Sequence, residues 1–73
     1  MPPRGHELPS EYVTRDLRER IKRGEWASGE AIPPVKQLQE SYQVSASTIH
    51  KAVRQLVDEG LLRTRPRWAT TVA

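Results

Sequence analysis

Apolar residues recur at helical spacing in three separate stretches of the chain. The first set repeats every four residues and consists of Val13, Leu17 and Ile21. This spacing places one apolar stripe along a helix, with charged residues over the rest of its surface. Ser10 can cap the start of such a helix, and Gly24 can end it. The pattern therefore predicts a helix over residues 10–23, and we interpret its charged side as plain solvent-facing surface.

The stretch over residues 25–34 cannot continue as a helix. Gly29 and the Pro33–Pro34 pair interrupt it at both ends. Ile32 precedes a proline and is biased toward an extended backbone. We therefore predict a loop that contains a short strand segment and buries Trp26 and Ile32.

A second helix, about two turns long, is predicted to start at Val35, where the prolines end. Its single apolar face consists of Val35, Leu38 and Tyr42. Only two residues separate Tyr42 from Ser45, so the second and third helices must meet across a tight turn. This arrangement is a helix-turn-helix.

The strongest helical pattern lies over residues 45–59. Ser45 is a good N-cap, Val44 is placed to pack on Ile49 as a hydrophobic staple, and Gly60 is the expected left-handed stop. The apolar stripe consists of Ile49, Ala52, Val53, Leu56 and Val57. Burial of that stripe turns the opposite side outward, which carries Ser47, His50, Lys51, Arg54 and Asp58.

Two short strands are predicted after Gly60. The segments LLRTR and WATTV have strand character, and Pro66 and Arg67 suit the turn between them. One side of the second strand carries Trp68, Thr70 and Val72. Three helices followed by a two-stranded ribbon form a mainly α fold, the three-helix winged helix-turn-helix. We assign residues 1–9, with three prolines, to a flexible N-terminal arm and residues 10–73 to this domain.

Composition and charge narrow the function. The chain has 73 residues, a formal net charge of +3 and no cysteine, which fits a small domain in the reducing cytoplasm and excludes disulfides. From Leu61 onward every ionisable side chain is an arginine, which favours an anionic partner such as nucleic acid. No apolar run approaches the roughly 20 residues of a membrane span. We find no constellation for catalysis, a cofactor or a metal, so we expect a protein that is not an enzyme.

An ordered series of positions matches a known pattern with the elements V-S-x-x-T-V-x-x-A, L-x-x-E-G-L and G-x-G-T-x-V. The matching residues are Ile21, Gly24, Gly29, Ile32, Pro33, Leu38, Val44, Ser45, Thr48, Ile49, Ala52, Leu56, Glu59, Gly60, Leu61, Thr70 and Val72. Over residues 8–72 the chain thus resembles the N-terminal winged-helix domain of the GntR family of bacterial transcriptional regulators. The resemblance implies sequence-specific binding of double-stranded DNA and transcriptional regulation, as a repressor. It places helix 45–59 in the major groove and wing 61–72 on the backbone or minor groove.

The chain departs from the family pattern at three places. Pro34, Val35 and Lys36 stand where many relatives have serine, glutamate and arginine. The planar guanidinium of a phosphate-contacting arginine is thus replaced by the compact ammonium charge of a lysine. Ala46 and His50 stand where many relatives carry arginines in the recognition helix. At the wing tip the two glycines are replaced by Arg67 and Ala69.

The candidate DNA-binding residues fall into two groups. A helix in the major groove presents its N-terminal residues to base edges, and here these are Ser45, Ala46, Ser47, Thr48 and His50. Cations that flank a groove contact phosphates and set position rather than sequence, and here these are Lys36, Lys51, Arg54, Arg65 and Arg67. The orientation of Arg63 stays open, because strand alternation can turn it away from DNA.

One module contacts one half-site, so useful specificity requires two copies, bound as a homodimer to a palindromic operator with centres about 34 Å apart. We expect no small-molecule effector pocket in this chain. Two alternatives remain: a winged helix that binds another protein through an exposed tryptophan patch, and a DNA-bending accessory factor of a mobile element.

Overall fold

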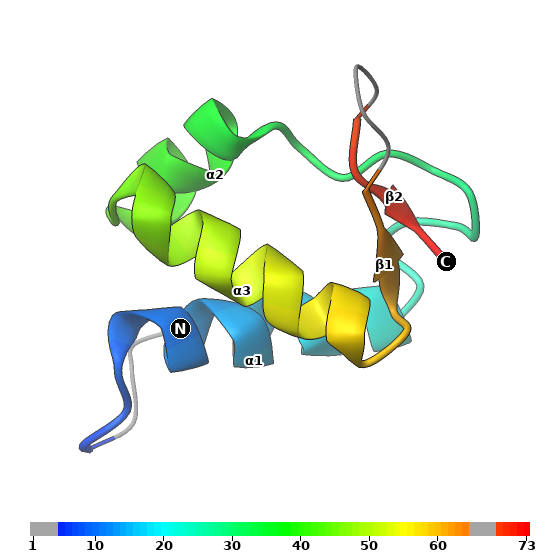
Figure 1. Cartoon of the computed structure of the whole chain (residues 1–73). Coiled ribbons are helices and arrows are strands. Elements are labelled where there is room, and N and C mark those ends of the chain that lie inside the picture. Colours follow the sequence, from blue (N-terminus) through cyan, green and yellow to red (C-terminus); the bar gives the residue numbers. More distant parts are fainter. Residues whose placement is uncertain (1–4, 65–68) are drawn as a thin grey trace.

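The computed structural model describes residues 5–64 and 69–73, and within them three helices precede a small antiparallel sheet (Figure 1). The elements in chain order are α1 (Pro9–Lys22), α2 (Val35–Tyr42), α3 (Ala46–Asp58), β1 (Leu62–Arg63) and β2 (Thr71–Val72). This order confirms the predicted mainly α fold with a β-ribbon at its end. None of the helices in the described part of the chain is long and apolar enough to cross a membrane.

α3 lies at the centre of the domain. It runs alongside α1, meets α2 at its N-terminal end and leads into β1 at its C-terminal end (Figure 1). The largest side chains that are fully buried are Leu17, Leu38, Ile49, Leu56, Leu62 and Val13. Most of the predicted core is therefore confirmed, while Ile21 is only partly buried against it. Because every element contributes to one cluster, the position of α3 is set by all the others.

The start of α1 differs from the prediction. Pro9 occupies the first turn, where its missing N–H costs nothing. The backbone N–H of Leu8 donates to Glu11 Oε1 at 3.1 Å. The predicted capping role of Ser10 is wrong, because Ser10 lies inside the helix and its carbonyl accepts from Thr14 Oγ1 at 2.7 Å. At the other end the helix stops at Lys22, followed by Gly24 at φ 80°.

The helix-turn-helix follows the prediction closely. α2 has the bounds expected from the prolines before it, and α3 is capped by Ser45, whose Oγ accepts from the Thr48 N–H at 3.2 Å. Gln43 takes the left-handed conformation, with φ 56°, in the turn between the two helices. Gly60 ends the α3 segment at φ 79°, as the sequence predicted.

The wing is shorter than predicted, with two paired residues in each strand. Leu62 pairs with Val72 and Arg63 with Thr71. The carbonyl of Thr70 accepts from the Ile32 N–H at 2.9 Å. The predicted turn at Pro66 and Arg67, and the orientation of Trp68, lie outside the described residues.

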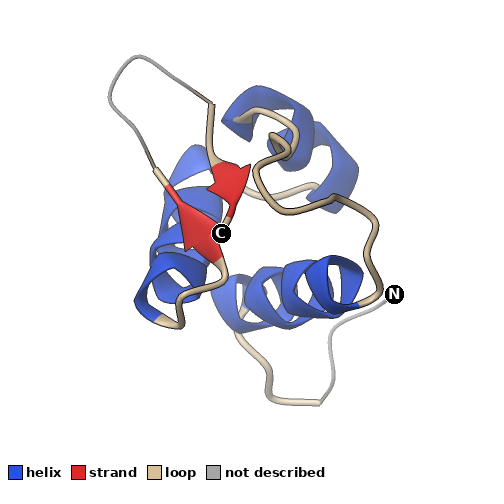
Figure 2. Ribbon diagram, turned by 90° about the vertical axis from the view of Figure 1, so that its right-hand side faces the viewer, coloured by secondary structure: helices blue, strands red, loops and turns tan. Residues whose placement is uncertain are grey.

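The loop between α1 and α2 runs beside β2 of the wing and bonds to it as a third segment of extended chain (Figure 2). Ala31 makes a bridge to Thr71, one residue before the predicted strand position. The Val72 N–H donates to the Glu30 carbonyl at 2.9 Å, and the Gly29 N–H donates to the Val72 carbonyl at 2.8 Å. Trp26 and Ile32 are buried, as predicted.

Candidate nucleic-acid interface

The outer face of α3 carries the side chains that the sequence assigned to DNA. We define this face by four exposed residues: Ser47, His50, Lys51 and Arg54. They lie opposite a buried stripe of Ile49, Ala52, Val53 and Leu56. The prediction that burial of the stripe turns these polar side chains outward is confirmed.

The face is ordered along the helix axis. Residues four apart lie one above the other, so Ser47 and Lys51 form one row and His50 and Arg54 the next. Within each row a polar side chain that can donate and accept hydrogen bonds precedes a cation. The step between them is about 6 Å along the axis, at about 1.5 Å per residue.

The other predicted base-reading residues lie at the start of α3. Ser45 is exposed, but its hydroxyl already serves the helix cap. Thr48 is half-buried, and its Oγ1 lies 3.1 Å from Ser45 Oγ. Ala46 is half-buried and offers only a methyl group. Among the described residues the side chains of Ser47 and His50 make no hydrogen bond, whereas those of Ser45 and Thr48 contact each other.

Four cations, two of them on this face, lack acidic partners among the described residues. Lys36 on α2, Lys51 and Arg54 on α3, and Arg63 on β1 are all exposed. Across residues 5–64 and 69–73, none of these four side chains makes an ion pair or a side-chain hydrogen bond. Unneutralised cations beside a polar helix face are suited to a polyanion, because they keep their attraction for phosphate. The predicted Arg65 and Arg67 lie outside the described residues.

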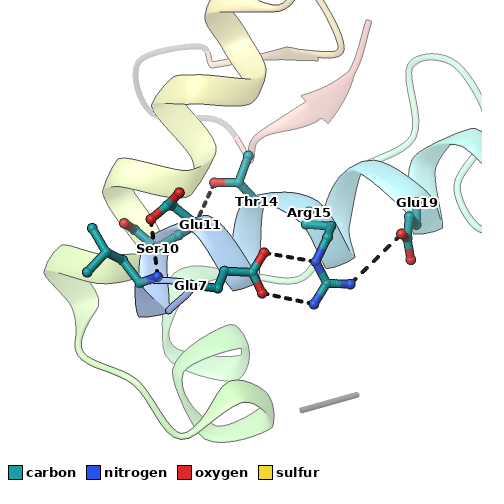
Figure 3. A network of polar contacts seen from close by, with 7 residues as sticks. Glu7, Ser10, Glu11, Thr14, Arg15 and Glu19 are labelled. Atoms are coloured by element: carbon teal, nitrogen blue, oxygen red, sulfur yellow. Dashed lines mark hydrogen bonds and ion pairs between the residues drawn. The ribbon is translucent and has the colours of Figure 1, made fainter. Parts of the chain in front are cut away.

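The arginines of α1 are arranged differently, which corrects the interpretation of that side as plain solvent-facing surface. Arg15 faces Glu7, with its Nε at 2.9 Å and its Nη2 at 3.0 Å from the two carboxylate oxygens, and Glu19 lies on its other side (Figure 3). Arg20 pairs with Glu25. These carboxylates raise the pKa of both guanidinium groups, chiefly through the hydrogen bonds they accept.

Arg18 ties α1 to the end of α3, a contact that the sequence did not predict. Its Nε and Nη2 donate to the two oxygens of Glu59 at 2.8 and 2.6 Å. Gln55 Nε2 also donates to Glu59, at 2.9 Å. The hydrogen bonds from Arg18 and then from Gln55 lower the pKa of Glu59 to about 2. Glu59 therefore stays ionised, and the positive charge of Arg18 balances its negative charge.

A depression of about 530 Å³ lies between α1 and α3. The residues that line it are Glu7, Ser10, Glu11, Thr14, Arg15, Arg18, Lys51 and Gln55. These side chains are polar or charged, unlike the mostly apolar walls of small-molecule pockets. In the described ranges no three His, Cys, Asp or Glu side chains come together in a way that could hold a metal ion.

A helix-turn-helix with a β-ribbon behind it defines the winged-helix class, and solved structures agree. The DNA-binding domain of AraR, in a crystal structure with operator ORX1, is 30% identical with a TM-score of 0.88, over 90% of this chain and 80% of that one. A GntR protein of Streptococcus agalactiae is 30% identical with a TM-score of 0.79, over 88% of this chain and 31% of that one.

Sequence comparison identifies the family. The profile described as "Bacterial regulatory proteins, gntR family" matches residues 9–72. The chain belongs to the gntR family of bacterial regulatory proteins, which confirms the resemblance drawn from its motifs.

Two curated relatives extend the comparison. The mannosyl-D-glycerate transport/metabolism system repressor MngR of Escherichia coli (strain K12) is 38% identical over 58 residues, which cover 80% of this chain and 24% of MngR. The uncharacterized HTH-type transcriptional regulator YisV of Bacillus subtilis (strain 168) is 33% identical over 72 residues, which cover 97% of this chain and 15% of YisV. The chain thus spans about a quarter or less of the length of these relatives.

Proposed function

We propose that the chain binds double-stranded DNA sequence-specifically, as the DNA-binding module of a transcriptional repressor. The observation that carries this proposal is the outer face of α3, where two hydrogen-bonding side chains and two cations are exposed and have no carboxylate partner within residues 5–64 and 69–73. The AraR domain with a similar fold has been crystallised with operator DNA, and MngR is named as a repressor. Both facts support the proposal.

In this proposal α3 lies in the major groove and each residue of its outer face has a role. Ser47 and His50 contact base edges, because they lie near the N-terminal end that enters the groove. Ala46 lies close to the same bases. Ser45 and Thr48 hold the start of the helix at the sugar-phosphate backbone of the DNA. Lys51 and Arg54, one turn further on, contact phosphates.

Cations outside α3 extend the contact to neighbouring phosphates. Lys36 reaches the backbone from α2, and Arg65 and Arg67 from the wing contact the backbone or the minor groove. The operator is a palindrome bound by two copies whose centres lie about 34 Å apart, one turn of the double helix.

The alternative of a protein-binding winged helix receives no support from the described residues. That alternative called for an exposed tryptophan in an apolar patch, and Trp26 is buried, with 8% of its surface exposed. The largest exposed hydrophobic side chain described is Leu8, which stands alone. A single apolar side chain is too small for a protein interface.

Selection of bound duplexes from a random pool tests the proposal. We expect a recovered consensus and salt-sensitive binding at micromolar or lower concentration. Ser47→Ala and His50→Ala should each relax particular base positions, by about 1–3 kcal/mol. Arg67→Ala should weaken binding more evenly across sequences. Recovery of no consensus, together with no binding at low salt, would refute the proposal.

A matched control separates lost base contacts from general damage. Ser28 lies in the loop after α1, and its Oγ donates to the Ala73 carbonyl at 3.1 Å. Ser28→Ala removes the same chemical group as Ser47→Ala, but away from the outer face of α3. It should leave the selected consensus unchanged.

A further inference from the structure

Tyr42, the last residue of α2, is held by α1 through its hydroxyl group. The hydroxyl donates to Asp16 Oδ2 at 2.6 Å and accepts from Arg20 Nη1 at 3.0 Å. The rings of Tyr42 and Tyr12 also pack in a T-shaped arrangement, with centroids 5.8 Å apart and planes at 86°. Both hydrogen bonds involve an ionised group, so they are stronger than neutral ones.

Arg20 extends this cluster to the loop that precedes α2. Its Nε donates to Glu25 Oε2 at 2.8 Å, and its guanidinium lies 4.6 Å from the centre of the Trp26 ring. A single arginine therefore joins α1, the loop and α2. We call this cluster the Tyr42 hub, which consists of Asp16, Arg20, Glu25, Trp26 and Tyr42.

α2 depends on such attachments because it is short. A helix of eight residues is not stable by itself and takes its direction from packing. Leu38 is fully buried, and Tyr42 lies one turn further along the same side. Leu38 and the partly buried Val35 hold the first part of α2 against the core, whereas the hub holds the end of the helix.

Lys36 lies on the other side of the same helix. It is exposed, and it is about 200° around the axis from Leu38, at about 100° per residue. Its position lies about 9 Å along the axis from Tyr42. Because a helix with its side chains is about 10–12 Å across, a tilt of about 10° about Leu38 would move the outer end of the Lys36 side chain by about 2 Å, enough to lengthen a phosphate contact.

From these contacts we infer that Tyr42 and Arg20 are positioning residues for DNA binding: through the hub they hold α2 at the angle at which Lys36 reaches a phosphate. This inference rests on the proposed function, since it concerns how one contact of that interface is aligned. Neither side chain needs to touch DNA.

A double-mutant cycle on Tyr42→Phe and Lys36→Ala tests the inference. The duplex is the consensus selected by the wild-type chain, and affinity is measured over a series of salt concentrations. Lys36→Ala should lower the magnitude of the salt slope by about 0.9, the effect of one phosphate. Tyr42→Phe should lower it by a similar amount and weaken binding about three- to tenfold, and the double variant should show no further fall in slope.

Tyr12→Phe is the matched control. It also removes a phenolic hydroxyl beside α1, but that hydroxyl is not part of the hub, so the salt slope should stay at the wild-type value. If Tyr42→Phe keeps the wild-type slope, or if its effect adds fully to that of Lys36→Ala, the inference is overturned. Absence of binding by the wild-type chain would instead refute the proposed function, and this inference with it.

Thermal unfolding of each variant guards against loss of the fold. We expect Tyr42→Phe to remain folded, because the buried apolar cluster is unchanged. Should it not fold, Arg20→Lys provides the same test, since lysine keeps the charge but loses the planar fork that reaches Glu25 and Tyr42 together. Unfolding of both variants would overturn the positioning role, because the hub would then be a requirement of the fold itself.

Discussion

α1 and α3 are both rich in charged residues, yet their charges are arranged in opposite ways. Arg15, Arg18 and Arg20 of α1 each face a carboxylate. Lys51 and Arg54 of α3 face none within the described part of the chain. The same residue types thus make one surface whose positive charges are paired with carboxylates and another whose positive charges are available to an anionic partner.

The comparison shows that the number of cations does not locate a polyanion-binding surface. An arginine that already shares two hydrogen bonds with a carboxylate must lose them before it can bind phosphate. An exposed lysine or arginine with no such partner releases only counterions and water. The pairing of each cation is therefore more informative than its charge.

The largest effect is expected where both surfaces depend on the same core. Leu56 is fully buried on the inner side of α3, beneath its outer face. Leu56→Ala should lower the free energy of unfolding by about 2–5 kcal/mol, because it leaves a cavity. Denaturant unfolding measures this loss. DNA binding should disappear in proportion to the unfolded fraction, and an unchanged unfolding midpoint would show that α3 is not held by this core.

Removal of the cations on α3 should change DNA binding without changing stability. Lys51→Ala with Arg54→Ala should lower the magnitude of the salt slope by about 1.8, twice the effect of one phosphate. Titration of the selected duplex at several salt concentrations gives the slope, and the midpoint of thermal unfolding should stay close to that of the wild type. A slope that does not change would place the DNA on another surface.

Removal of a paired cation should lower stability slightly without changing DNA binding. In Arg18→Met the apolar stem remains, while the two hydrogen bonds to Glu59 are lost. The pair is partly exposed, so we expect a loss of up to about 1 kcal/mol in the free energy of unfolding. The salt slope of DNA binding should be unchanged. A slope reduced as much as by loss of Lys51 would mean that Arg18 also contacts phosphate.

The smallest expected effect is a dependence of stability on acid. The pKa of Glu59 lies at about 2 in the folded chain, against 4.5 as its ordinary value. Its contribution to stability is therefore fully present above about pH 4.5 and is lost as the pH falls through about 2. Acid unfolding curves of the wild type and of Glu59→Gln should converge across this interval. Curves that stay parallel would show that Glu59 is not stabilised by Arg18.

Local signals explain how much of the fold could be predicted. The two prolines fixed the start of α2, Ser45 the start of α3 and Gly60 its end, because each acts on its own backbone. The same local reasoning was wrong at Ser10. Pro9 fits the first turn and Glu11 reaches back to Leu8, so the helix starts before the serine.

Contacts between distant residues could not be predicted in the same way. Arg18 and Glu59 are 41 positions apart, and they meet only because α1 packs along α3. The outward direction of Ser47 and His50 followed from periodicity alone. The lack of a carboxylate partner for Lys51 and Arg54 among the described residues could not be predicted, because it depends on where the carboxylates around them lie.

The bridge between the wing and the loop after α1 makes that loop a template for the wing. β2 is bonded to β1 on one side and to residues 29–32 on the other, so a slip of one residue would break both sets of bonds and turn Val72 outward. Val72 is buried, and its amide donates to the Glu30 carbonyl. This amide should accordingly be among the slowest outside the helices to exchange with solvent deuterium. A substitution at Glu30 or Ala31 should therefore alter the orientation of β1 and β2, although neither residue belongs to these strands.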